Sequence, residues 1–120
     1  MAFDWKEYLE LSRFLAGETA TTPGEQAAHR SAVSRAYYAA FCHARNYARD
    51  RHGFSPEDTA KDHSRVRDHF RARGSVELAR RLDSLRRWRN DCDYKDTVVS
   101  LPRILVEAIE QAQGILDRLT

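Results

Sequence analysis

Apolar residues recur three or four positions apart through most of the chain, which is the period of a helix with one buried face. Glycines and prolines interrupt this pattern and divide it into five segments. We predict helices over about 4–16, 23–52, 62–73, 75–93 and 101–119. No convincing stretch alternates apolar and polar residues as a half-buried strand does. The pattern therefore predicts an all-α fold.

Residues that favour helix ends support these boundaries. Asp4 with Glu7 three positions later forms a capping-box pattern, and Pro23 occupies the expected first position of the longest helix. Asp62 and Ser75 are the expected N-caps of the third and fourth helices.

Each predicted helix carries one apolar stripe, and together the stripes form the predicted core. Short connections favour antiparallel neighbours, so we predict one domain over 1–120, an up-and-down bundle of four to five helices. The stripe residues are Tyr8, Leu9, Leu11, Leu15, Val33, Tyr37, Ala40, Phe41, Ala44, Ala48, Val66, Phe70, Leu78, Leu82, Leu85, Ile104, Leu105, Ala108, Ala112, Ile115, Leu116 and Leu119.

One charged residue interrupts an apolar stripe. At 100° per residue, Arg89 falls between Leu85 and Cys92 on the inward face of the fourth helix. An isolated buried charge is costly, so this guanidinium needs a partner or must face a cleft or an interface. Two interpretations stay open: a structural ion pair with Asp93, and a functional position.

A second unusual stripe follows the longest helix beside its apolar face. Arg35, Tyr38, Arg45 and Arg49 lie along it at helical spacing. Basic residues around an aromatic ring suit a nucleic-acid backbone and a stacked base. The alternative is an amphipathic margin whose arginines pair with acids of a neighbouring helix.

The charge distribution changes the picture that the net charge of +2 gives. Residues 30–89 contain 15 basic and 7 acidic residues, a net of +8, whereas the segments before and after them are each −3. Arginine dominates, with 17 Arg and 3 Lys. Arginine is favoured where a planar fork must bind phosphate or carboxylate.

Several classes are excluded by the composition. No apolar run is long enough to span a membrane, and the first residues do not resemble a secretory signal. Cys42 and Cys92 form no disulfide framework and are expected to be reduced. The five histidines lack metal-ligand spacing, and no cofactor motif is present. We expect a cytoplasmic protein without metal or cofactor and without a membrane partner.

Three segments resemble conserved motifs of HEPN-domain proteins. SRAYYAAF at 34–41 is similar to the family's S-R-x-Y-Y-A-x-F segment, and LRRWRNDCDY at 85–94 resembles the L-R-x-x-R-N-x-x-D-Y ending of small stand-alone members. Between them, HSRVRDHF at 63–70 resembles an H-x-x-V-x-x-x-F segment. The order and the spacing of all three segments agree, and the predicted helical bundle is the HEPN fold.

The resemblance implies a homodimer and a role in a toxin–antitoxin or defence system, often with a nucleotidyltransferase partner. Many members are metal-independent ribonucleases, whose signature is an arginine, a polar residue and a histidine four to six residues beyond the arginine. Arg89 and Asn90 match the first two positions, but Tyr94 stands where the histidine is expected. A phenol is a poor base at neutral pH. His63 is the alternative proton-transfer group, and Tyr94 itself is a candidate for modification by such a partner.

Three functions follow as hypotheses. The first is a dimeric RNA- or nucleotide-binding module with weak or no catalysis, in which Arg35, Arg45, Arg49 and Arg89 hold phosphate and Tyr38 stacks on a base. The second is an endoribonuclease toxin that uses Arg89 with Asn90 and moves the proton through Tyr94 or His63. The third is a structural adaptor in which Arg35, Arg89 and Asp93 form buried polar pairs.

Overall fold

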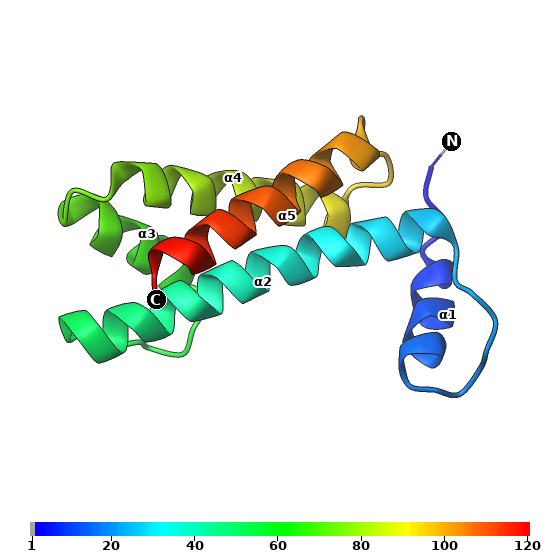
Figure 1. The fold of residues 1–120 in the computed structure, drawn as a ribbon. Coiled ribbons are helices and arrows are strands. Elements are labelled where there is room, and N and C mark those ends of the chain that lie inside the picture. Colours follow the sequence, from blue (N-terminus) through cyan, green and yellow to red (C-terminus); the bar gives the residue numbers. More distant parts are fainter. Residues whose placement is uncertain (1) are drawn as a thin grey trace.

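The computed structural model describes residues 2–120 and confirms the all-α fold. It contains the helices α1 (Lys6–Leu15), α2 (Glu25–His52), α3 (Asp62–Ala72), α4 (Val76–Tyr94) and α5 (Leu101–Arg118). In Figure 1, α4 runs antiparallel to α2 and α5, with α3 packed beside α4. Helices α2 to α5 therefore form an all-α helical bundle built around the long α2, in which α2 and α5 run in the same direction.

The core follows the predicted stripes closely in α2 to α5. Small residues of α2 let α5 and α4 pack closely against it, and larger side chains of the other helices fill the space between them. The fully buried members include Val33, Tyr37, Ala40, Ala44, Ala48, Val66, Leu82, Leu85, Cys92, Ala108 and Ile115. The inward face of α4 is thus the one that the sequence predicted.

Two predicted helix starts differ in detail. The helix α2 begins at Glu25 with Gly24 as its N-cap, so Pro23 lies before the helix rather than at its first position. Asp62 is the first residue of α3 and does not cap it; its carboxylate instead accepts the backbone N–H groups of Glu57 and Asp58. Asp62 therefore organises the loop before the helix, a role that spacing along one helix does not reveal.

The prediction for the first helix is only partly correct. Helix α1 packs mainly against α2, it reaches α4 through a hydrogen bond from the Tyr8 hydroxyl to the Cys92 carbonyl, and it lies at the end of the bundle in Figure 1. Leu11 is buried, but Leu9 and Leu15 are 59% and 72% exposed. The apolar stripe of α1 is wider than the surface available to cover it.

A buried arginine joins the N-terminal segment to the end of α4. Arg30 is fully buried and donates to the carbonyl oxygens of Cys92, Lys95 and Asp96 at 2.9, 2.6 and 3.0 Å. Its guanidinium lies 4.3 Å from the ring centroid of Phe3. Because helix C-termini carry partial negative charge, a cation there is favourable. Sequence reasoning did not single out Arg30, which fixes the end of α4 relative to α2.

The structure shows Cys42 and Cys92 as free thiols. Within residues 2–120, no helix combines the length and apolar character needed to cross a bilayer.

Candidate phosphate-binding site

Arg89 is the central residue of the candidate site, and it lies on the inward face of α4. The side chain is 13% exposed, between the fully buried Leu85 and Cys92, as the helical spacing predicted. Its nearest acid is Asp93, one turn further along, at 3.6 Å. Asp93 also accepts a long hydrogen bond of 3.5 Å from Ser34 of α2. Arg89 is therefore anchored by an ion pair, but only loosely.

Two adjacent tyrosines of α2 cover the guanidinium. The Arg89 Cζ atom lies 5.4 Å from the ring centroids of both Tyr37 and Tyr38. These are cation–π distances, and the rings shield the charge from solvent. The Arg89 Nε atom is buried and has no hydrogen-bond partner within residues 2–120. A buried donor without an acceptor is destabilising.

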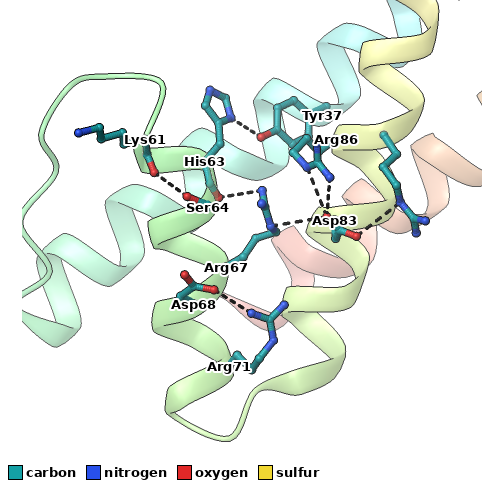
Figure 2. Close-up of polar contacts among 10 residues, drawn as sticks. Tyr37, Lys61, His63, Ser64, Arg67, Asp68, Arg71, Asp83 and Arg86 are labelled. Atoms are coloured by element: carbon teal, nitrogen blue, oxygen red, sulfur yellow. Dashed lines mark hydrogen bonds and ion pairs between the residues drawn. The ribbon is translucent and has the colours of Figure 1, made fainter.

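The structure brings His63 of α3 to the same pair of tyrosines. Its Nδ1 atom is hydrogen-bonded to the Tyr37 hydroxyl, as Figure 2 shows. The imidazole stacks on Phe41 with a centroid distance of 4.2 Å, and its centroid lies 6.3 Å from that of Tyr38. His63 and Arg89 lie 26 positions apart in the sequence, and both lie against Tyr37 and Tyr38.

Burial and positive charge together determine the protonation states of His63 and Tyr37. Burial lowers the pKa of His63 below its ordinary 6.5, and the nearby Arg89 and Arg67 lower it further. Burial raises the pKa of Tyr37 to about 12, against the opposing effect of Arg89. At neutral pH the tyrosine therefore keeps its proton and the imidazole is neutral, and the direction of their hydrogen bond depends on the imidazole tautomer. In the tautomer in which the Tyr37 hydroxyl donates to Nδ1, the ring proton lies on Nε2.

Three arginines of α3 and α4 converge on a single carboxylate near the hydrogen-bonded His63 and Tyr37. Asp83 lies 3.6 Å from Arg67, 2.9 Å from Arg86 and 3.4 Å from Arg87. Figure 2 shows this cluster beside the His63–Tyr37 hydrogen bond. One acid cannot neutralise three arginines, so the cluster contributes positive charge near His63. Sequence reasoning missed Arg67 and Arg86, although their helical spacing from His63 and Arg89 was available.

Two depressions on the surface meet at Tyr38. A groove of about 660 Å³ runs between α1 and α2 and reaches Arg35 and Asp93. A cavity of about 350 Å³ lies between α2 and the start of α3, where Arg45 and His63 line it. Arg35 and Arg45 are ten residues apart, so they lie about 15 Å apart along the helix axis. Tyr38 lies between them, as the interleaved stripe predicted.

The other predicted site residues lie apart from this arrangement or add little to it. Arg49 is exposed and paired with Asp50 at 2.9 Å, so the structure does not bring it to the site. Tyr94 is 74% exposed and makes no hydrogen bond within residues 2–120. Asn90 is half-buried beside Arg89, and the described residues offer it no hydrogen bond.

The Arg89–Asp93 pair is weaker than a well-matched salt bridge. Burial raises the pKa of Asp93, and the opposing effects of Arg89 and Ser34 do not reverse that shift. The carboxylate is therefore poorly compensated in the folded protein. Arg89 consequently retains donor capacity beyond this pair.

Within residues 2–120, no three His, Cys, Asp or Glu side chains gather as a metal site would require. Comparison of the chain with protein-family models, with curated proteins and with solved structures finds no match.

Proposed function

We propose that the protein is a HEPN-type module that binds RNA or a nucleotide through phosphate contacts and has weak or no catalytic activity. The observation that carries the proposal is the state of Arg89, a largely buried guanidinium with one loose ion pair and a buried, unpartnered Nε. Such a group has donors to spare for an anion. The excess positive charge around Asp83 adds an attractive field for phosphate.

Surface residues of α2 supply the rest of the binding surface in this proposal. Arg35 and Arg45 contact separate phosphates of the bound strand, and Tyr38 between them stacks on a base. His63 adds a hydrogen bond from Nε2–H to a phosphate oxygen, from inside the cavity that it lines. A homodimer, a toxin–antitoxin role and a nucleotidyltransferase partner follow from the family resemblance alone.

The protonation states of His63 argue for binding rather than efficient cleavage. A general base at Nε2 needs that nitrogen unprotonated, whereas a Tyr37 hydroxyl that donates to Nδ1 leaves the ring proton on Nε2. A general acid needs the imidazolium form, which burial and the neighbouring arginines disfavour. The proximity of His63 to Arg89 nevertheless keeps a metal-independent ribonuclease as the second candidate, with His63 in place of Tyr94.

A structural adaptor is the third candidate, and the Arg89–Asp93 ion pair is the observation that favours it. In that case Arg89 contributes to stability and contacts no ligand. Buried polar pairs of this kind can fix helix register.

The test combines RNA binding and RNA cleavage by the wild-type protein and by Arg89→Met, which keeps the aliphatic stem without the charge. Arg80→Met on the exposed face of the same helix is the matched control. We expect salt-dependent binding of single-stranded RNA that Arg89→Met weakens and Arg80→Met changes less, with little or no cleavage. Each lost phosphate contact lowers the slope of log K against log salt by about 1.

Cleavage that Arg89→Met abolishes would instead support the ribonuclease. The absence of RNA and nucleotide binding at any salt concentration would leave the adaptor. Circular dichroism of both variants establishes that each is folded before binding is compared.

A further inference from the structure

The cavity between α2 and the start of α3 combines aromatic walls with one exposed acid, Asp58. Its volume is about 350 Å³, at the lower end of the range for small-ligand sites. Tyr38, Phe41 and Arg45 line it from α2, while Asp58 and His63 line it from the opposite side. An aromatic platform, a cation and a carboxylate at the same cavity suit a planar, polar ligand joined to a phosphate.

The two acids of this cavity have different partners. The buried Asp62 accepts hydrogen bonds from the backbone N–H groups of Glu57 and Asp58 at 3.0 and 2.9 Å, and from Arg65 at 2.7 Å. Its oxygens are therefore committed to the loop and to α3. The carboxylate of Asp58 accepts no hydrogen bond within residues 2–120, and its side chain is exposed at the cavity.

The loop holds Asp58 in a definite orientation. Its backbone φ of 60° lies in the left-handed region, which residues other than glycine adopt uncommonly and which aspartate and asparagine tolerate best. The bond from its N–H group to Asp62 stabilises that conformation. The Asp58 carboxylate is thus presented from a fixed backbone, with free acceptors.

A carboxylate discriminates among the four bases of RNA by the donors at their Watson–Crick edges. Guanine presents two adjacent donors, N1–H and the N2 amino group, which match the two oxygens of a carboxylate. Adenine and cytosine place an acceptor nitrogen beside a single amino group, and uracil flanks one N–H with two carbonyl oxygens. An acceptor facing a carboxylate is repelled, so guanine alone pairs with Asp58 at both oxygens.

We propose that this cavity is a guanine-selective base site of the bound RNA. The base stacks on Tyr38, and Asp58 accepts hydrogen bonds from its N1–H and N2–H groups. Arg45 and the Nε2–H group of His63 contact the adjoining phosphate. This inference rests on the proposed RNA-binding function and adds to it the identity of one preferred base.

The test compares fluorescence-anisotropy titrations of labelled octauridine with octamers that carry a single central guanine or adenine. We expect the guanine octamer to bind more tightly than either of the others. A well-formed bidentate contact discriminates by roughly 5- to 150-fold. Asp58→Asn replaces one acceptor with an amide donor, and asparagine tolerates the left-handed backbone, so the preference for guanine is expected to disappear in a folded protein.

Asp50→Asn is the matched control, because it removes the same charge from an exposed residue of α2 that lies outside the cavity. This variant is expected to keep the guanine preference. Equal binding of all three octamers by the wild-type protein, or a guanine preference that Asp58→Asn leaves intact, would overturn this inference while the proposed RNA binding stands. Failure of every octamer to bind at low salt would contradict the proposed function itself, and this inference with it.

Discussion

Replacing Arg30 by methionine tests how the end of α4 is held. The substitution keeps an unbranched aliphatic stem but removes the donors that reach the carbonyls of Cys92, Lys95 and Asp96. It also removes the cation that contacts the Phe3 ring at 4.3 Å. The expected result is a large loss of stability.

The magnitude follows from two opposing terms. Three hydrogen bonds from a charged donor contribute about 1.5–3 kcal/mol each, whereas burying the guanidinium itself costs several kcal/mol. The difference predicts a decrease of about 2–4 kcal/mol in the free energy of unfolding. For a domain of this size, that lowers Tm by roughly 8–16 °C.

Urea unfolding followed by circular dichroism measures this free energy, and thermal unfolding measures Tm. Arg80→Met is the matched control, because the Arg80 side chain is 70% exposed and pairs with the half-exposed Glu77. The control is expected to lose no more than about 0.5 kcal/mol. A loss below about 1 kcal/mol for Arg30→Met would refute the idea that Arg30 fixes the end of α4.

Three further predictions concern single side chains. The hydrogen bonds that Asp62 accepts lower the pKa of its carboxyl group. Its contribution to stability is therefore present above pH 3.8 and is lost as the pH falls through the lowered pKa. Asp62→Asn should reduce the urea midpoint at pH 7 but not in strong acid. Burial lowers the pKa of both His52 and His69, whose ring nitrogens are 2.9 Å apart. Their contribution to folding stability is therefore present above pH 6.5 and is lost as the pH falls through the lowered pKa values. His69→Gln should make the urea midpoint decrease less between pH 7.5 and pH 5. Tyr94→Phe should leave RNA binding and any residual cleavage unchanged, because the hydroxyl lies on an exposed side chain, and a tenfold loss of either would show that Tyr94 acts at the site.

The sequence predicted the helices of the bundle well because their apolar stripes are regular. The stripe of α2 from Val33 to Ala48 and that of α4 from Leu78 to Cys92 both face the core as expected. The helix α1 was predicted correctly but the burial of its apolar stripe was not, because a helical wheel shows which side is apolar and not how much surface is available to cover it. Leu15 remains exposed for that reason.

The candidate site was predictable only where its residues share a helix. Arg35, Tyr38 and Arg45 were found from their spacing on α2. The meeting of His63 with Arg89 depends on the packing of α3 and α4 against the same two tyrosines, and no spacing within one helix encodes it. Arg49 has the correct spacing but pairs with its neighbour Asp50, a contact that the helical period does not indicate.

The ion pair between Arg67 and Asp83 is another contact that spacing within one helix does not predict. Its partners lie on different helices, so the local surplus of arginines around one acid appears only in the folded chain. The segment charge of +8 indicated that such a surplus exists but not where it lies.

An NMR titration of the His63 imidazole tests most directly whether phosphate binds at the site that His63 and Arg89 form with Tyr37 and Tyr38. In the free protein the pKa of His63 should lie below 6.5, because burial and Arg89 disfavour the cation. A phosphate held at Nε2–H favours the cation, so saturating single-stranded RNA should raise this pKa. If saturating RNA leaves the pKa of His63 unchanged, the phosphate does not bind at this histidine and the account is contradicted.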